Sequence, residues 1–136
     1  MIRIFIADDF SAMRRAMELL VAGEDDMEVV AEAGNLQAAL ELMEQVDFDV
    51  ILMNDYLPPM SSAQAAGLIR GRGIKTPILV MSMHEDEELA GEALLNGANG
   101  FIVKTEFLQT FAPAVRAVYR GDIYLSPRIK ALLEEE

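Results

Sequence analysis

Residues 50–53 of the chain read Val-Ile-Leu-Met and are followed at once by Asn54 and Asp55. Such a short apolar run, bounded by polar residues, is typical of a β-strand that is covered on both faces, as strands of parallel sheets are. This stretch therefore predicts a central strand of a parallel sheet, with polar side chains where the strand ends.

Similar runs alternate with helical patterns along the whole chain, which predicts five βα units and an α/β fold. The predicted strands are Arg3 to Ala7, Glu28 to Glu32, Val50 to Met53, Ile78 to Met81 and Gly100 to Val103. The second run is the least apolar of them, so we expect it at an edge of the sheet. Between the strands, residues 13–21 and 36–43 show the apolar spacing of amphipathic helices that pack on a sheet.

Several residues predict where the helices begin and end. Asn35 and Ser62 are placed to cap the second and third helices, and Gly97 to close the fourth. Pro113 is awkward in a helix that begins at Phe107, so we expect the fifth helix to begin near Thr110 and to run over 111–120.

A last short helix is predicted over residues 128–135, beyond the fifth βα unit. Ser126 would be its cap and Pro127 would stand at its first position, where proline is well tolerated.

Length and composition narrow the class of protein. The 136 residues fit one domain, and the apolar fraction of 52% is enough for a real core. The absence of cysteine excludes disulfides, thiolate metal sites and catalytic thiols. A net charge of −12 opposes binding to nucleic acid or to anionic lipid. The apolar start of the chain is too short for a signal peptide or a membrane span, so we expect a cytoplasmic protein.

Polar residues follow four of the five predicted strands. Asp8 and Asp9 follow the first, Asn54 and Asp55 the third, Ser82 the fourth and Lys104 the fifth. Because the carboxyl ends of parallel strands lie at one edge of the sheet, we expect these residues to meet. Each residue alone is ordinary for a loop, and the specificity comes from the set.

This set suits the handling of a phosphoryl group. Asp8 and Asp9 supply the hard oxygen ligands that Mg²⁺ prefers, while Ser82 and Lys104 would neutralise charge on the phosphoryl oxygens. A carboxylate at position 54 could form an acyl phosphate, but the amide of Asn54 lacks that nucleophile. Strand alternation aims Asp55 at the opposite face from Asn54, which makes it a poor substitute.

Together, residues 7–9, 49–60, 76–82 and 97–104 resemble the motifs of receiver domains from bacterial two-component response regulators. The resemblance covers residues 2–120 and implies a flavodoxin-like sheet of strand order 2-1-3-4-5, with five helices and a further C-terminal helix. Residues 83–87 and 121–127 resemble receivers that precede a helix-turn-helix output domain. We therefore expect a receiver domain over 1–121 and an extension over 122–136 that begins a linker to an output domain.

The resemblance also implies roles for individual residues. Asp9, position 54 and the Tyr56 carbonyl would ligate Mg²⁺, with Asp8 acting mostly through water. Ser82 and Lys104 would contact the phosphoryl group, and Phe101 would be the aromatic switch that turns inward when Ser82 moves. Implied partners are a sensor histidine kinase, which docks at the first helix, and a second copy, which docks at the face of the fourth helix, fifth strand and fifth helix.

Three functions remain open at this stage. The first is a phosphorylation-controlled switch in which Asn54 replaces a native aspartate, so that this form is not phosphorylatable. The second is a natural pseudo-receiver that binds proteins without phosphate. The third is a small hydrolase or phosphotransferase with Asp55 as nucleophile, for which no second acid is placed as a base. Receivers assist only their own phosphoryl transfer, so we do not expect a conventional enzyme.

Overall fold

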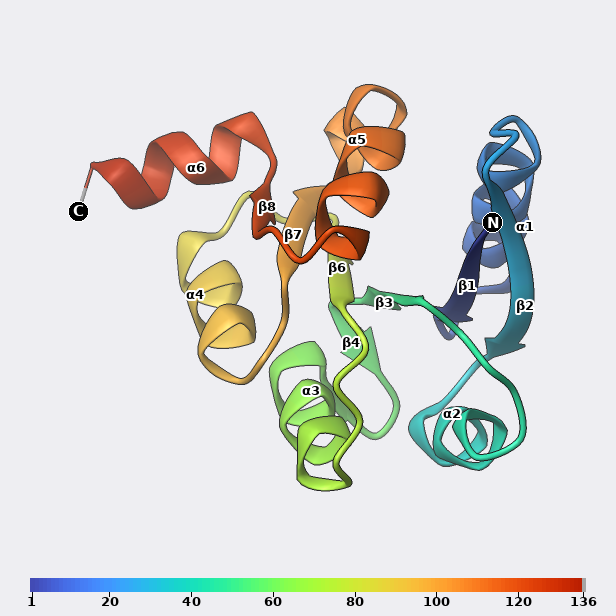
Figure 1. Cartoon of the computed structure of the whole chain (residues 1–136). Coiled ribbons are helices and arrows are strands. Elements are labelled where there is room, and N and C mark those ends of the chain that lie inside the picture. The colour runs from blue at the N-terminus through green and yellow to red at the C-terminus, as the bar shows by residue number, and fades with distance from the viewer. Residues whose placement is uncertain (136) are drawn as a thin grey trace.

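The computed structural model describes residues 1–135 and is built around one parallel sheet (Figure 1). The strands are β1 (Ile2–Ala7), β2 (Met27–Ala33), β3 (Val50–Asn54), β6 (Ile78–Ser82), β7 (Gly100–Val103) and β8 (Tyr124–Leu125). Their order is β2-β1-β3-β6-β7-β8, which confirms the predicted order 2-1-3-4-5 and the edge position of the second strand. The short sixth strand, β8, was not predicted.

The register of the sheet aligns the carboxyl ends of the strands. Ala7 of β1 lies opposite Met53, Asn54 opposite Met81, and Ser82 opposite Val103. The residues that end or follow β1, β3, β6 and β7 are therefore neighbours across the sheet, as the parallel arrangement requires.

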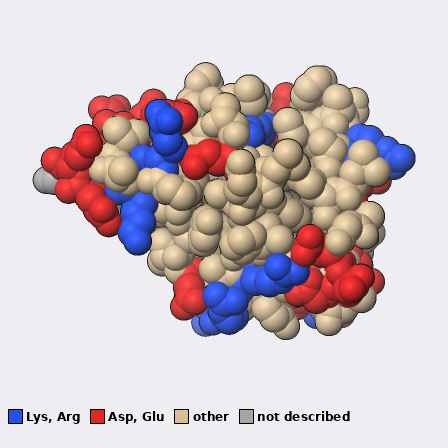
Figure 2. All heavy atoms as spheres, turned by 90° about the horizontal axis from the view of Figure 1, so that it is seen from above, with Lys and Arg blue, Asp and Glu red and all other residues tan. Residues whose placement is uncertain are grey.

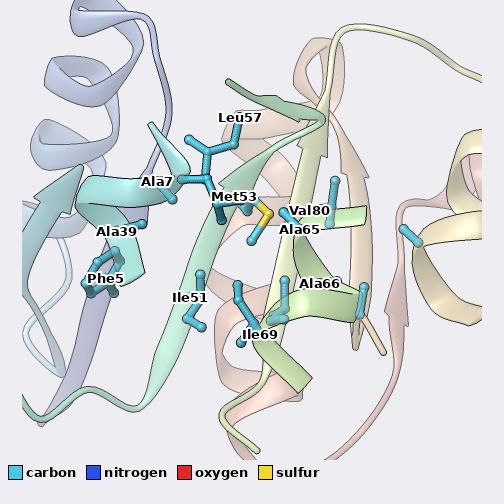
Figure 3. Packing of buried hydrophobic residues seen from close by; sticks show 14 of the residues in the cluster. Phe5, Ala7, Ala39, Ile51, Met53, Leu57, Ala65, Ala66, Ile69 and Val80 are labelled. Atoms are coloured by element: carbon cyan, nitrogen blue, oxygen red, sulfur yellow. The ribbon is translucent and has the colours of Figure 1, made fainter. Parts of the chain in front are cut away.

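Helices cover both faces of the sheet. α1 (Ser11–Ala22) and α5 (Phe107–Tyr119) pack on one face, and α2 (Leu36–Met43), α3 (Ser62–Gly71) and α4 (Glu87–Leu95) on the other. Figure 3 shows the second of these cores, where Ile51, Met53 and Val80 of the sheet pack near Ala65 and Ile69 of α3. No helix within residues 1–135 has the length and apolar character needed to cross a membrane.

The loop after β3 forms a small hairpin of β4 (Tyr56–Leu57) and β5 (Met60–Ser61) that leads into α3. Ser61, and not Ser62, caps α3, so that prediction is wrong by one residue. The Ser61 hydroxyl accepts from the Gln64 amide at 3.3 Å, and the Gln64 side chain accepts from the Ser61 amide at 3.2 Å. This reciprocal pair requires a Glu or Gln three residues after the cap, which only Ser61 has.

Two other predicted helix ends are confirmed. The Asn35 side chain accepts from the Ala38 amide at 2.8 Å and caps α2. Gly97 follows the end of α4 with φ of +109°, in the left-handed region that favours glycine. A Cβ at Gly97 would also come within 2.7 Å of the Arg70 side chain, so the position has no room for a larger residue.

The predicted late start of α5 is wrong, because the helix begins at Phe107 and follows a 3₁₀ turn, η1 (Lys104–Glu106). Phe107 and Phe111 are both buried, and their rings stack with centroids 5.3 Å apart. Pro113 and Gln109 are exposed, so the Gln109 carbonyl that lacks a donor from Pro113 faces solvent. Burial of the two rings therefore outweighs the missing hydrogen bond.

The end of the described chain returns to the sheet and then packs on α4. β8 pairs with β7, and α6 (Pro127–Glu134) buries Ile129 in the core that α4 shares. Ser126 stands at the predicted cap position, but its buried hydroxyl has no hydrogen-bond partner within residues 1–135 and makes no cap bond. The predicted extension over 122–136 thus contains β8 and α6, while Glu136 lies outside the described residues.

Candidate functional site

The carboxyl ends of β1, β3 and β7 bring four of the predicted site residues together. The Lys104 ammonium donates to the Asn54 side-chain oxygen at 2.8 Å and lies 3.8 Å from Asp8 Oδ2. Asn54 in turn lies 3.4 Å from the Asp9 carboxylate. Asp8, Asp9, Asn54 and Lys104 therefore form one cluster, drawn from segments far apart in the sequence.

The orientation of the Asn54 amide is fixed by its neighbours. Its single oxygen accepts from Lys104, and its nitrogen donates to the Tyr56 carbonyl at 3.1 Å and to Asp9 Oδ1 at 3.4 Å. Reversing the amide would set its NH₂ group against the Lys104 ammonium, two donors facing each other. The nitrogen of Asn54 thus lies between the two oxygens that were expected to ligate Mg²⁺.

Asp8 carries the most buried carboxylate of the cluster, with no exposed surface. Its Oδ1 accepts from the Phe10 amide at 2.8 Å, whereas Oδ2 is buried without a hydrogen-bond partner within residues 1–135. Burial raises the pKa of Asp8, and the Phe10 amide and Lys104 oppose that rise. A buried carboxylate oxygen of this kind is costly unless a cation lies nearby.

These oxygens fit a magnesium ion in part. Two carboxylates and the Tyr56 carbonyl match the hard oxygen ligands that Mg²⁺ prefers. Asp8 Oδ2 has no hydrogen-bond partner within residues 1–135, and a bound cation would take that place. Asn54 does not complete this set of magnesium ligands, because its side-chain oxygen faces Lys104. Its NH₂ group, a hydrogen-bond donor, faces Asp9 and the Tyr56 carbonyl instead. Residues 1–135 contain no group of three or more His, Cys, Asp or Glu side chains arranged to hold a metal.

Ser82 lies at the end of β6 and is fully buried. Its hydroxyl donates to Asp55 Oδ2 at 2.6 Å and accepts from the His84 amide at 3.0 Å. The Asp55 carboxylate therefore points toward the end of β6. β3 ends at Asn54 and the chain bends at Asp55, so strand alternation no longer sets the direction of that side chain.

Phe101, the predicted aromatic switch, lies on β7, opposite Val80 of β6 and Leu125 of β8. Its ring is fully buried in the same core as Val80 and Val103, on the face covered by α2, α3 and α4. The ring therefore points inward in this structure.

A hollow adjoins the cluster on the other face of the sheet, between α1 and the start of α5. It has a volume of about 190 Å³ and is almost entirely apolar apart from Lys104. Its lining residues are Met13, Ala16, Leu20, Lys104, Phe107 and Leu108. Leu108 is 81% exposed beside it, so the rim offers apolar surface to a partner.

Comparison with known proteins places this arrangement in a family. Residues 4–116 match the family model described as the response regulator receiver domain. The chain is 37% identical over 139 residues to the oxygen regulatory protein NreC of Staphylococcus carnosus, with 98% of this chain and 62% of the relative covered. It is 32% identical to the transcriptional regulatory protein DegU of Brevibacillus brevis, of which it covers 57%. The chain thus spans about three-fifths of the length of these relatives.

Solved structures agree with this result. A two-component response regulator of the LuxR family from Aurantimonas sp. SI85-9A1 superposes with a TM-score of 0.93 at 28% identity, over 98% of this chain and 95% of that one. The isolated receiver of RcsB from Salmonella enterica, in the presence of BeF₃⁻, superposes with a TM-score of 0.88 over 96% of this chain and 97% of that one, and at 16% identity supports the fold alone. The chain therefore belongs to the response regulator receiver domain family and is homologous to the LuxR-type regulators within it.

Proposed function

We propose that this receiver domain of a two-component response regulator is in a form that is not phosphorylated at Asn54. The observation that carries the proposal is the Asn54 amide itself, whose oxygen accepts from Lys104 and whose nitrogen donates to Asp9 and Tyr56. Phosphorylation would need an anionic oxygen at this position to attack phosphorus while the leaving group departs. A neutral amide is a far weaker nucleophile, and here both its polar atoms are engaged.

The remaining residues are equipped for that chemistry once a carboxylate is present. Lys104 would neutralise charge on the phosphoryl oxygens, and the Ser82 hydroxyl would donate to one of them after leaving Asp55. Receiver domains generally bind Mg²⁺, and Asp8, Asp9 and the Tyr56 carbonyl would hold it in this chain. When bound there, the metal would supply positive charge that offsets the negative charge of the phosphoryl group.

The proposal is tested by incubating the chain and the variant Asn54→Asp with acetyl phosphate and Mg²⁺ and by measuring their intact masses. Only Asn54→Asp should gain a phosphoryl group. Gln45→Glu is the matched control, because it adds the same charge at an exposed position between α2 and the start of β3, at the opposite edge of the sheet from the cluster. A phosphoryl gain in the unaltered chain would overturn the proposal and point to another acceptor, such as Asp55, the next residue in the sequence. No gain in any of the three would favour the pseudo-receiver described below.

Response regulators partner with sensor kinases and form dimers, and both partners can be proposed for this chain at particular surfaces. The apolar hollow between α1 and α5 adjoins Lys104, so a kinase docked there would hold its phosphohistidine beside position 54. A homodimer through α4, β7 and α5 would have to include α6, because α6 packs on α4. An output domain, as the names of the regulatory relatives suggest, would supply DNA binding that the charge of −12 opposes in this chain alone.

A second candidate is a natural pseudo-receiver that binds proteins without phosphate. The contact between Ser82 and Asp55 favours it, because the hydroxyl expected to bind a phosphoryl oxygen already donates to a carboxylate of the chain. In that case restoring Asp at position 54 would leave partner binding unchanged.

A further inference from the structure

The hydrogen-bonding capacity of Ser82 is fully used inside the protein. A hydroxyl has one hydrogen to donate, and that of Ser82 goes to Asp55 Oδ2 at 2.6 Å, a length typical of a hydroxyl bound to an ionised acceptor. Its oxygen accepts from the His84 amide at 3.0 Å. While the contact with Asp55 persists, Ser82 has no hydrogen for any other anion.

Asp55 is held in place by contacts that do not involve Ser82. Its backbone carbonyl accepts from the Ser62 amide at 2.9 Å, at the first residue of α3. On its other side the chain is fixed by Asn54, which Lys104 holds by its side-chain oxygen. The Asp55 carboxylate is therefore a fixed anion at the end of β3, within reach of β6.

Ser82 in turn anchors the loop of residues 83–86 between β6 and α4. The His84 amide bonds to the Ser82 hydroxyl, and Asp86 at the end of the loop caps α4 through the Glu88 amide at 2.9 Å. Between them, Glu85 pairs with Arg128 of α6 at 2.8 Å. One series of contacts thus leads from Asp55 to the start of α4 and to α6.

We propose that the Asp55 carboxylate serves Ser82 in place of a phosphoryl oxygen and so holds the 83–86 loop, with α4 and α6, in one arrangement without phosphorylation. The inference rests on the proposed function, since it supposes that Asn54 carries no phosphoryl group. It also accounts for Phe101, which is already fully buried in this structure. On this view Asp55 is a positioning residue that acts through Ser82.

The alternative is that the contact is only local. If so, water would take the place of Asp55 on the Ser82 hydroxyl, and the loop would keep its stability. The two cases differ in the protection of backbone amides in the loop, α4 and α6, which hydrogen exchange measures without any phosphate donor.

The experiment compares hydrogen exchange by mass spectrometry in the unaltered chain, Asp55→Ala, Ser82→Ala and the double variant. Each single variant should raise the exchange rates of residues 83–95 and 127–134 about ten- to a hundredfold, the effect of losing a hydrogen bond to a charged group. The double variant should exchange no faster than Ser82→Ala, because Ser82→Ala already removes the contact with Asp55 together with the hydrogen bond from the His84 amide. Exchange in β1 and β3 should stay unchanged, which also reports that the variants fold.

Asp25→Ala is the matched control. It removes a carboxylate of the same kind from the exposed turn after α1 and should leave the loop, α4 and α6 unaffected. The proposal is overturned if Asp55→Ala leaves the exchange of these segments unchanged, or if the effects of Asp55→Ala and Ser82→Ala add in the double variant. Neither result bears on phosphoryl gain at position 54, which the mass measurement tests separately.

Discussion

The difference between Asn and Asp at position 54 lies in the number of acceptors as well as in charge. An aspartate could offer one oxygen to Lys104 and the other toward Asp9 and the Tyr56 carbonyl, where a cation would bind. Asn54 has one oxygen, and the Lys104 ammonium takes it at 2.8 Å. The atom left facing Asp9 and Tyr56 is a donor, which opposes a metal ion at that point.

Magnesium affinity should therefore rise strongly in the variant Asn54→Asp. We expect at least a roughly tenfold lower Kd for Mg²⁺, since a full negative charge beside a divalent cation contributes more than about 1.4 kcal/mol even at an effective dielectric constant of 20. Isothermal titration calorimetry measures the change. Gln45→Glu adds the same charge at the opposite edge of the sheet, and an equal gain in that variant would show that net charge alone is responsible.

Four residues of the site could be predicted from the sequence because their position follows from a local pattern. Asp8, Asp9 and Lys104 come directly after apolar runs and Asn54 ends one, and the parallel sheet aligns those ends. The contact of Asp55 with Ser82 could not be predicted. It depends on the bend after β3, which is set by the hairpin of residues 56–61 and by its junction with α3.

Among the elements, α3 is tied to its surroundings by Arg70 near its C-terminal end. The Arg70 guanidinium donates to the carbonyls of Gly97, Ile74 and Thr76 and to the Asn99 side chain, at distances from 2.8 to 3.1 Å. Asn99 uses the same oxygen to accept from the Ile78 amide at the start of β6. One side chain thus joins α3, the start of β6 and the turn between α4 and β7.

Replacing the Arg70 side chain should lower the stability of the folded protein. Arg70→Met keeps much of the apolar stem but removes every donor, so several half-buried carbonyls lose their partners. We expect the free energy of unfolding to fall by about 3 kcal/mol in urea denaturation. Arg72→Met removes the neighbouring arginine, which pairs with exposed Glu44 at 3.5 Å, and should cost less than about 1 kcal/mol. Similar losses in both variants would contradict the role given to Arg70.

Pro113 in α5 is a position where a substitution should raise the stability of the protein. Pro113→Ala restores an amide that can donate to the exposed Gln109 carbonyl, in a helix that already continues through this position. We expect the protein to become more stable by about 1 kcal/mol or more, part of the roughly 3 kcal/mol by which proline disfavours a helix interior. Thermal unfolding followed by circular dichroism measures it. An unchanged or lower Tm would mean that proline is needed here for the shape of α5.

The helices and strands also show how much of the fold can be predicted from local sequence patterns. All five main strands were predicted to within two residues at each end, because their apolar runs are short and sharply bounded. The start of α5 was missed because the burial of Phe107 against Phe111 is a tertiary effect that outweighs the local signal of Pro113. β8 was missed because two residues form a strand only when β7 is there to pair with them.

For the molecule as a whole, pairs of opposite charges join segments that lie far apart in the sequence. Asp49, before β3, accepts from the backbone amide of Arg3 at 2.8 Å and from its guanidinium at 3.1 Å. The hydrogen bonds from Arg3 lower the pKa of Asp49. Those from Arg116 of α5 lower the pKa of Asp26 in the same way.

A lowered carboxyl pKa stabilises the folded state above the unfolded pKa, near 4, and that contribution is lost as pH falls through the folded value. Asp49→Asn should therefore lower the free energy of unfolding by about 1 kcal/mol at pH 7, and the deficit should shrink toward zero below about pH 4. Denaturant unfolding at several pH values measures both. Asp25→Asn should show no such trend, and a deficit in Asp49→Asn that persists in acid would argue for a role in packing instead.

Seen from above, charged side chains of both signs gather at the end of the molecule that carries α6, whereas the middle of this face is largely uncharged (Figure 2). α6 is held there by the buried side chain of Ile129, in the core that α4 shares, and by the pair of Arg128 with Glu85 of the loop before α4. Any protein that needs bare α4 must first lift this helix away and expose Ile129 to water. Exposing that side chain costs roughly 2 kcal/mol, which lowers the affinity of such a partner about thirtyfold. α6 thus competes with any such partner for the surface of α4. A partner that binds α6 and α4 together does not have to displace α6 and keeps its full affinity.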